Sequence, residues 1–558
     1  MIFFSSYVRL LRTRARVRFF TFFFLLAAGA VVYFFATQRT DNIPVITDID
    51  PPVGMPEDLL TITGENFGTT KGNSYVDIAN SRITGSRYIS WSDKRIELRL
   101  PANVQDGLVT VNTGNGRSAP VFFANKSNIP VPVRTDPKTT VPFIQSVSPA
   151  TPAAVTIGQT ITIIGSNFGM ARGNAEVYFT ANREGDGRQF IAASANDYDY
   201  EYWSDNEIHV RVPDGAASGL LYISTERGES QQVTLSVNFA AGKKDYTNLH
   251  TYSLRTVADL QNNSAEATQD IILYMPRPAV SSMQPEATIG EISPAPLISD
   301  DLNNIIFQSS IPPADEAKHS FSVTSVVKVY AITANIIPRQ IAAYSDKNRL
   351  LYKTYTSPEA GIPSAATAIK ELSETICGKT RNPYDKAKAI YDYIVENYKI
   401  RSMVRTGNVE ATDLLERKTG DAYDFAIVYT ALCRAASIPA LPMCGVFVEG
   451  QDSVKNHWWA EIYFENYGWF PVDCALGAGL EYRLFAPPDN PRLFYFGNLD
   501  NQHLAFSRGR NQIRSSLSSN RVVQRPRSYA LQSCWEETNL SDANYSSLWS
   551  DPAIIGIY

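Results

Sequence analysis

Residues 418–440 read KTGDAYDFAIVYTALCRAASIPA, residues 456–464 read NHWWAEIYF, and residues 468–475 read GWFPVDCA. In the first segment, apolar residues recur from Phe425 to Ala436 at the i, i+3, i+4, i+7 spacing of one helical face. This spacing predicts a buried helix that begins near Asp421 or Ala422. The second segment alternates along the chain, and Asn-Tyr-Gly leads into a third run that ends at Asp473. The pattern predicts a strand, a turn and a strand.

This order of blocks resembles the transglutaminase-like branch of the papain-type thiol enzymes, in which Cys, His and Asp follow one another along the chain. The matching residues are Gly420, Asp424-Phe425-Ala426, Arg434 to Ala440, His457 to Glu461, and Gly468-Trp469 to Asp473. The resemblance implies an α+β domain, which we expect over residues 357–510. It also implies that His457 is the base and that Asp473 orients it.

The family's nucleophilic cysteine stands two residues after that glycine, where this sequence has Ala422. The chemistry needs a thiol at a helix N-terminus beside an imidazole, because both features favour the thiolate. Cys433 is no substitute, since it lies ~16 Å further along the helix at ~1.5 Å per residue. Cys474 follows Asp473 directly, so on a strand its side chain points to the opposite face. We interpret Cys433 and Cys444 as inert core thiols.

The pairing of His457 with Asp473 rests on the resemblance rather than on periodicity. A tight turn at Asn466-Tyr467 would set Asp473 opposite Ala460 or Glu461, several residues short of His457. The alternative interpretations are a hydrogen-bonded, half-buried structural histidine at position 457 and a solvated strand-end carboxylate at position 473. We predict that His503, in the segment NLDNQH, is structural rather than catalytic.

The composition indicates packed domains behind a membrane segment. The chain has 558 residues, of which 44% are hydrophobic, and a net charge of −5, which argues against a general affinity for nucleic acid. Residues 19–36 form an apolar run, FFTFFFLLAAGAVVYFFA, just long enough to cross ~30 Å of hydrocarbon. Arginines concentrate in residues 1–18 and only Arg39 closely follows the run. The positive-inside rule therefore predicts a cytoplasmic N-terminus and an extracytoplasmic body; a cleaved signal peptide is the alternative.

The segment IPVITDIDPPVGMPEDLLTITGENFGTTKGN, residues 43–73, recurs as VPFIQSVSPATPAAVTIGQTITIIGSNFGMARGN, residues 141–174. Both copies continue to Trp-Ser-Asp, and the second carries an insertion at REGDGRQ, residues 183–189. Short alternating strands between Gly, Pro and Asn predict antiparallel sandwiches over residues 43–124 and 141–240. The repeat resembles the IPT/TIG group of immunoglobulin-like domains, with Gly-x-Asn-Phe-Gly as its most specific element. We interpret these glycines as turn residues that need a positive φ.

The remaining segments complete the domain organisation. Residues 126–138 are Pro-rich and predict a linker. Residues 245–340 contain strand patterns, QDIILYMP and HSFSVTSVVKVYAIT, and predict a third β-sandwich. An apolar stripe from Ile362 to Ile376 predicts a helix ended by Gly378, and Asn382-Pro383 predicts the cap of the next. Residues 511–558 form a C-terminal extension. The arginines of residues 508–527 indicate either a solvated loop or a contact with acidic envelope polymer or lipid headgroups.

These patterns predict a multidomain chain with one N-terminal transmembrane helix, all-β immunoglobulin-like sandwiches, and an α+β transglutaminase-like domain. We expect an extracytoplasmic pseudoenzyme, in the periplasm or at the cell surface, that binds or scaffolds. The alternative is an active thiol acyltransferase or peptidase whose cysteine has been replaced by Ala422; a purely structural domain is a third interpretation. Expected partners are the membrane and envelope proteins, peptides or peptidoglycan, without nucleic acid. The sequence predicts no cofactor and no metal.

Overall fold

The computed structural model describes residues 43–102, 104–126, 141–149, 153–183, 190–313, 317–359, 361–404, 411–509, 521–524, 535–538 and 544–558. The chain divides into two compact units, the first built from the first repeat and the second from everything after residue 141 that the structure describes. The segment predicted to span the membrane, residues 19–36, lies outside the described residues. Within the described ranges, no helix combines the length and the apolar character that a membrane crossing requires.

The first unit is a sandwich of two sheets around a core that includes Leu60, Ile62, Val109 and Val111. One sheet has the order β1 (Val45–Asp50), β3 (Leu59–Glu65), β7 (Arg95–Arg99), β6 (Tyr88–Trp91). The other has the order β2 (Val53–Gly54), β10 (Val121–Asn125), β8 (Gly107–Thr113), β4 (Tyr75–Ile78), β5 (Ser81–Arg82), with β9 (Gly116–Arg117) on β8.

The two glycines of the Gly-x-Asn-Phe-Gly motif are required for two different physical reasons. Gly68 has a φ of 87°, as expected for a turn glycine. Gly64 is not in the left-handed region, so the turn interpretation is wrong for it; a Cβ there would lie 1.9 Å from the carbonyl oxygen of Val45. Trp91 Nε1 donates to Phe67 O at 3.0 Å, which joins the motif to Trp-Ser-Asp. The second repeat has the same close approach, with Gly165 against the carbonyl oxygen of Phe143.

The second repeat forms a second sandwich with the same strand order. One sheet has the order β11 (Phe143–Ser148), β12 (Thr160–Ser166), β16 (Glu207–Arg211), β15 (Tyr200–Trp203). The other has the order β14 (Phe190–Ala192), β13 (Glu176–Ala181), β17 (Ala216–Thr225), β18 (Gly228–Glu229), with β19 (Val233–Leu235) on β17. Within the predicted insertion, residues 184–189 lie outside the described residues.

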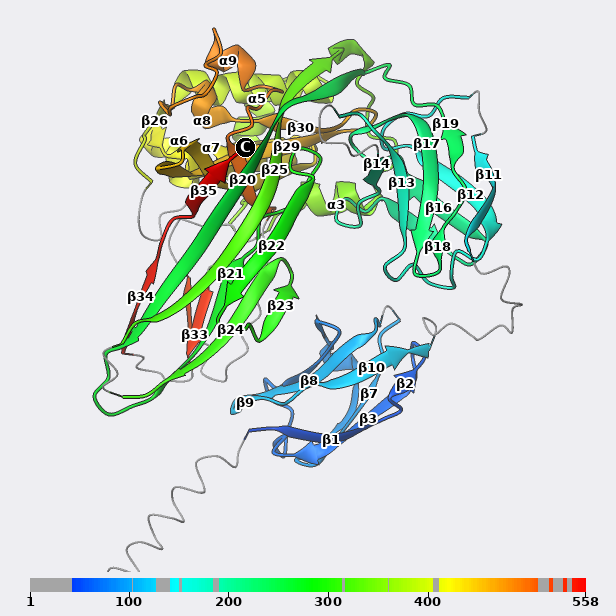
Figure 1. Ribbon diagram of the computed structural model, residues 1–558, viewed down its shortest axis with the longest axis vertical. Coiled ribbons are helices and arrows are strands. Elements are labelled where there is room, and N and C mark those ends of the chain that lie inside the picture. Colours follow the sequence, from blue (N-terminus) through cyan, green and yellow to red (C-terminus); the bar gives the residue numbers. More distant parts are fainter. Residues whose placement is uncertain are drawn as a thin grey trace, which may run out of the picture. The chain divides into compact units, whose positions relative to one another are not determined.

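A third sandwich follows, dominated by two long strands (Figure 1). One sheet has the order β22 (Glu286–Ser293), β25 (His319–Ile336), β20 (Gly242–Asn262), β34 (Tyr545–Trp549), with β35 (Ala553–Ile557) also on β20. The other has the order β23 (Ile298–Asp301), β24 (Asn304–Ile311), β21 (Gln269–Pro276), β33 (Trp535–Thr538), β32 (Arg521–Gln524). Strands from the segment predicted as a C-terminal extension therefore complete both sheets.

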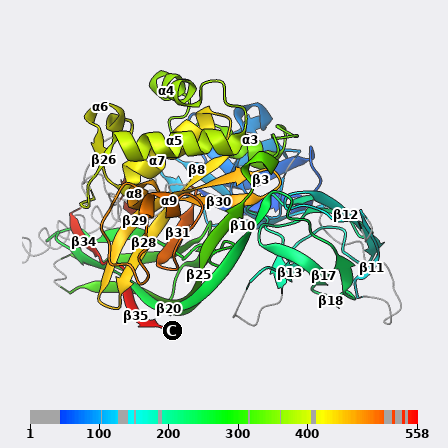
Figure 2. The ribbon, with the colours of Figure 1, turned by 90° about the horizontal axis from the view of Figure 1, so that it is seen from above.

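An α+β domain packs against this sandwich. Its sheet has the order β30 (Gly468–Val472), β29 (Ser453–Phe464), β28 (Ala440–Gly450), β31 (His503–Arg508), and β26 (Lys399–Ile400) pairs with β27 (Thr419–Gly420). Its helices are α3 (Leu350–Thr356), α4 (Thr367–Cys377), α5 (Pro383–Asn397), α6 (Leu414–Arg417), α7 (Ala422–Ala435), α8 (Cys474–Gly477) and α9 (Pro491–Phe494). The short 3₁₀ helix η3 (Pro338–Gln340) precedes α3, and η4 (Ala411–Asp413) precedes α6; a further one, η1 (Gly85–Arg87), belongs to the first sandwich. Figure 2 shows helices above one face of this sheet and the long strands β20 and β25 below the other.

The helix boundaries bear out one sequence prediction and correct another. Asn382 caps α5, its side chain accepting from Tyr384 N at 2.8 Å, with Pro383 at the first helical position. The predicted stripe from Ile362 begins too early, because α4 starts only at Thr367. Pro363 disfavours helical backbone at Ile362, the residue before it. Ile362 instead pairs with Glu359 in an isolated β-bridge.

Buried ion pairs join the second sandwich to the α+β domain. Arg508 forms an ion pair with Asp197 of the second sandwich, and its Nε donates to Glu461 Oε2 at 2.9 Å. Trp469 Nε1 donates to the same Asp197 at 3.0 Å. The Arg508 side chain is only 10% exposed. Neither predicted role for the arginine segment therefore applies to Arg508; residues 510–520 and 525–527 lie outside the described residues.

Candidate active site

The sequence at the start of α7 supplies the cap of this helix. Asp421 is the N-cap and accepts from Asp424 N at 3.1 Å, while Asp424 Oδ2 accepts from Asp421 N at 3.1 Å. This reciprocal pair satisfies two backbone donors that the first turn would otherwise leave without partners. Gly420 has no Cβ because one would lie 2.7 Å from Asp424 Oδ2. Ala422 is consequently held as the first residue of the helix, where it is 3% exposed.

The structure brings His457 and Asp473 together. Asp473 follows β30, whose last residue, Val472, is opposite Ala460 of β29. The predicted offset from His457 is therefore real, and the acid reaches the base diagonally across the two strands. His457 Nε2 and Asp473 Oδ2 are 2.6 Å apart. Both side chains are fully buried, so the half-buried alternative for His457 and the solvated alternative for Asp473 are wrong.

The carboxylate of Asp473 accepts four hydrogen bonds. Its Oδ1 accepts from the backbone amides of Ala475 and Leu476, at 2.8 and 2.9 Å, and thereby caps α8. Its Oδ2 accepts from His457 and, at 3.1 Å, from His503 Nε2. Burial alone raises the pKa of Asp473, but the charge of His457 and the hydrogen bonds from both histidines hold it well below its ordinary value. Asp473 is therefore a permanent anion.

His503, which the sequence predicted to be structural, belongs to the same cluster through a contact with Asp473 that the sequence did not predict. Its Nε2 faces Asp473, and its Nδ1 is 2.9 Å from Asp500 Oδ1. Burial lowers the pKa of His503, but the charge of Asp500 and hydrogen bonds to both acids raise it to about 9. A ring with a carboxylate at each nitrogen is doubly protonated. The spacing of Asp500 and His503 by three residues was the only sequence signal, and it does not reveal the contact with Asp473.

The cluster has the spacing of a metal site but the protonation of a hydrogen-bonded one. One ligand atom each from His457, Asp473 and His503 lies within 4.8 Å of the others. A metal ligand must be a neutral imidazole, whereas both nitrogens of His503 carry protons toward carboxylates. The residues present therefore fit a histidinium bridging two acids better than they fit a metal ion.

Ala422, the first residue of α7, carries only a methyl group. Its neighbour Tyr423 meets the ring of Trp458 edge-on, with centroids 5.8 Å apart, which sets the N-terminus of α7 against the part of β29 that carries His457. The other ring nitrogen of His457, Nδ1, is buried without a hydrogen-bond partner among the described residues. Buried polar atoms rarely lack a partner. His457 therefore has Nε2 on Asp473 and Nδ1 without a hydrogen-bond partner among the described residues.

The described cysteines do not supply a replacement thiol. Cys377, Cys433, Cys444 and Cys474 are all free and buried. Burial, the charge of Asp473 and the neighbouring Cys433 raise the pKa of Cys474 well above its ordinary value. Burial also raises the pKa of Cys433. Both thiols are thus held in the unreactive protonated form.

Comparison with known families agrees with the sequence resemblance. The family described as the transglutaminase-like superfamily matches residues 370–474, and the IPT/TIG domain family matches residues 44–125 and 142–241. The chain therefore carries a transglutaminase-like domain behind two IPT/TIG domains.

Individual relatives cover only parts of the chain. A cyclomaltodextrin glucanotransferase from Paenibacillus macerans is 34% identical over 129 residues, 23% of this chain and 16% of that enzyme, and such relatives match only the IPT/TIG parts. An uncharacterized protein of Haemophilus influenzae is 30% identical over 131 residues, 19% of this chain and 36% of that protein. The chain thus spans far less than two thirds of the length of these curated relatives.

Two solved structures align with parts of this chain. A candidate cysteine protease from Cytophaga hutchinsonii is 17% identical with a TM-score of 0.38, covering 56% of this chain and 93% of that one. The periplasmic domain of TgpA from Pseudomonas aeruginosa is 16% identical with a TM-score of 0.22, covering 42% and 90%.

Proposed function

We propose that this chain is a membrane-anchored protein of the bacterial cell envelope whose transglutaminase-like domain binds or scaffolds and does not catalyse. The observation that carries the proposal is the combination of Ala422 at the first position of α7 with His457, which is hydrogen-bonded to Asp473 through Nε2 and has no partner at Nδ1. The base and its orienting acid are kept, and the group they would activate is missing.

Acyl transfer through a covalent intermediate requires a nucleophile within hydrogen-bond reach of the base. A methyl group forms no bond to a carbonyl carbon, and the buried thiols nearby are held protonated. His457 alone would have to activate water, yet its side chain is fully buried. The histidines and carboxylates of this cluster hydrogen-bond to one another, which supports a role in holding the domain together.

The fixed cluster also supports scaffolding through rigidity. His503, as a histidinium between Asp473 and Asp500, ties the end of β30 and the start of α8 to β31. The rings of Phe447, Trp459 and Tyr482 surround His457, with centroids 6.0, 6.0 and 5.4 Å from the centroid of its ring. Such enclosure favours a permanent core over a site that opens to substrate at every turnover.

The location and partners in this proposal come from the sequence. The apolar run at residues 19–36 with basic residues before it supports an anchor with the body outside the cytoplasm. The candidate partners are envelope proteins, peptides or peptidoglycan. Protease added to intact spheroplasts should degrade the body of the protein while the N-terminus stays near Met1; a mature N-terminus near Val31 would replace the anchor with a cleaved signal peptide.

A second candidate function is an active thiol acyltransferase or peptidase in which Ala422 replaces the working cysteine. The specific observation in its favour is the 2.6 Å contact between His457 and Asp473, because an unused pair has no catalytic reason to persist. This function belongs to a form of the protein with a thiol at position 422.

The deciding experiment measures catalysis by the protein as it stands. Amine incorporation into glutamine-containing peptides and peptide hydrolysis should both remain at background. Turnover that survives purification and is lost in His457→Ala would show a working site and overturn the proposal. Arg492→Met, a surface change in the same domain, serves as the matched variant that should leave any measured rate unchanged.

A further inference from the structure

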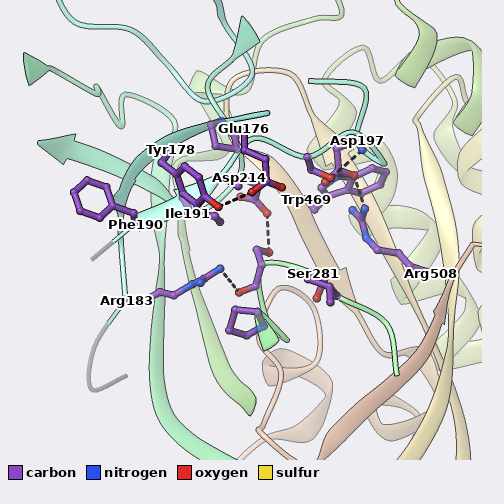
Figure 3. A pocket seen from close by; sticks show the side chains of 16 residues that line it. Glu176, Tyr178, Arg183, Phe190, Ile191, Asp197, Asp214, Ser281, Trp469 and Arg508 are labelled. Carbon is purple, nitrogen blue, oxygen red and sulfur yellow. Dashed lines mark hydrogen bonds and ion pairs between the residues drawn. The ribbon is translucent and has the colours of Figure 1, made fainter. Parts of the chain in front are cut away.

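A hollow of about 320 Å³ lies where the second IPT/TIG domain meets the third sandwich and the transglutaminase-like domain. Figure 3 shows Glu176 and Tyr178 on one side of it, with Trp469 and Arg508 on the other. A neighbouring hollow of about 500 Å³ shares Val280 and Arg508 with it. Both volumes fall within the range of roughly 300–1,000 Å³ that small-molecule sites occupy. This region is separate from the His457 cluster.

The walls of the hollow are fixed by hydrogen bonds and ion pairs between domains. Ser282 Oγ is 3.1 Å from Asp214 Oδ2, and Asp214 also pairs with the buried Lys244. Arg183 donates to the carbonyl oxygen of Ser282 at 3.2 Å. On the far side, Arg508 and Trp469 both contact Asp197. A ligand would therefore meet groups that are already held in place, which lowers the cost of ordering them on binding.

An aromatic patch, made of Tyr178, Tyr222 and Phe190, leads into the hollow. Tyr178 stacks on Tyr222 with ring centroids 4.9 Å apart and planes 8° apart, and Phe190 meets Tyr222 edge-on at 4.9 Å. All three side chains are half-buried and lie on the outer face of the sheet. Glu176 stands beside them and accepts from the Tyr178 hydroxyl at 2.5 Å.

The first IPT/TIG domain shows that the fold does not need this patch. Tyr178 is opposite Tyr222 in the register of β13 and β17. At the same register in the first domain, Asp77 of β4 is opposite Thr110 of β8. Phe190 directly follows the insertion that the second copy carries. Half-buried aromatic rings that a sister domain replaces with polar residues are better explained by a ligand than by packing.

The charges of the lining select a neutral ligand. Glu176, Asp197 and Asp214 face Arg183 and Arg508, so the lining holds three carboxylates and two guanidinium groups. Lys244, which pairs with Asp214, brings a third cation and balances these charges. The lining therefore offers no net attraction to an anionic ligand such as a nucleotide or an acidic polymer. A purely apolar ligand would remove water from these polar groups without giving them any hydrogen bond in return, which is unfavourable. The ligand must therefore combine an apolar face with neutral groups that both donate and accept hydrogen bonds.

The strand pairing argues against a peptide. An extended peptide binds by adding a strand to a free sheet edge. Tyr178 and Glu176 lie on β13, which is already paired with β14 on one side and β17 on the other. A bound helix would need a continuous apolar groove, whereas charged side chains from Glu176 to Arg508 interrupt the apolar part of this lining.

We infer that this hollow and the aromatic patch form a binding site for a neutral oligosaccharide. A pyranose ring presents a face of C–H groups that packs on an aromatic ring, and a rim of hydroxyls. Those hydroxyls donate to carboxylates such as Glu176 and accept from guanidinium groups such as Arg183. The two adjoining hollows provide room for a chain of several sugar units.

The test is calorimetric titration of the full-length protein with cellohexaose, xylohexaose, maltohexaose and chitohexaose as probes. At least one should bind. The decisive variant is Tyr178→Asp combined with Tyr222→Thr, which installs the residues that the first domain carries at the same register and so is compatible with the fold. It should weaken binding at least about tenfold, because it removes the stacking surface.

Two further variants keep the result interpretable. Glu176→Gln preserves the shape of the site and should weaken binding by removing a charged acceptor. Tyr202→Ala removes an exposed aromatic ring from the opposite sheet of the same domain and should leave binding unchanged. Thermal unfolding of each variant establishes that it is folded. The inference is overturned if none of the four probes binds, or if a folded double variant binds as tightly as the unaltered protein.

Discussion

His503 donates to the same carboxylate oxygen of Asp473 that holds His457, at a distance of 3.1 Å. The carboxylate of Asp473 is thus shared between two histidine rings, and one of them, that of His503, is permanently charged. The negative charge of Asp473 is therefore partly offset by the histidinium at position 503. The shared oxygen is a structural reason for regarding the cluster as a framework.

Stability should depend on the charge of His503. Its pKa is raised from 6.5 to about 9 in the folded protein. The stabilisation is therefore fully present below pH ~6.5 and is lost as the pH rises through 9. We expect the free energy of unfolding to fall over this interval by on the order of 3 kcal/mol, measured by urea unfolding at a series of pH values.

The histidine variants provide the control for this pH dependence. His503→Gln should abolish the decline between pH ~6.5 and 9, since glutamine does not titrate. His209→Gln changes a partly exposed histidine that pairs with Glu207 at 2.8 Å, and should keep the decline. Equal slopes in all three proteins would show that His503 is not the titrating group.

Arg508→Met should destabilise the contact between the second IPT/TIG domain and the transglutaminase-like domain. The change leaves Asp197 and Glu461 near each other without their shared cation. Removing one partner of a buried ion pair costs about 3–5 kcal/mol. Arg492→Met, at a side chain that is 39% exposed, should cost less than ~1 kcal/mol. Similar losses in both variants, measured by denaturant unfolding, would contradict the assigned role of Arg508.

Gly64→Ala should destabilise the first IPT/TIG domain. The new methyl group would lie 1.9 Å from the carbonyl oxygen of Val45, so strand β1 must shift away from β3. Overpacking of this kind costs about 1–3 kcal/mol. Hydrogen exchange of the β1 and β3 amides should accelerate accordingly. Gly114→Ala is the matched control because its Cβ would have no neighbour within 4 Å, and unchanged exchange in Gly64→Ala would refute the steric explanation.

Sequence patterns predicted what is encoded locally. The apolar spacing after Asp421 located α7, and the Asn-Pro pair located the start of α5, because helix faces and caps are set within a few residues. The repeated Gly-x-Asn-Phe-Gly motif indicated two sandwiches. Its first glycine was misinterpreted because the close approach of Val45 to Gly64 depends on strand pairing, which the motif does not contain.

The contacts that periodicity missed are those made across long stretches of chain. Asp197 and Arg508 are 311 residues apart, so no local pattern couples them. His503 reaches Asp473 because β31 pairs with the far side of β28, an arrangement that alternation along a strand does not specify. The same holds for β34 and β35, which return from the C-terminal residues to pair with β20.

Ala422→Cys tests whether His457 is aimed at position 422. A thiol there would sit at a helix N-terminus, which favours thiolate, but Asp421 and Asp424 occupy the same turn and oppose it. A low pKa therefore requires the cationic form of His457. If the pair is aimed at this position, the thiol pKa should fall from ~8.5 into the range of roughly 3.5–7.5 found for activated cysteines.

Iodoacetamide alkylation followed by mass spectrometry across a pH series measures this thiol. Because Ala422 is 3% exposed, the informative quantity is how the labelling rate changes with pH rather than its absolute value. Labelling should already be substantial at mildly acidic pH and should move to higher pH in the double variant with His457→Ala. Cys433 and Cys474, whose pKa values are raised by burial, are internal controls that stay unlabelled. If the introduced thiol titrates like an ordinary cysteine with or without His457, the pair does not face position 422, and the domain has kept the fold of a thiol enzyme without its catalytic geometry.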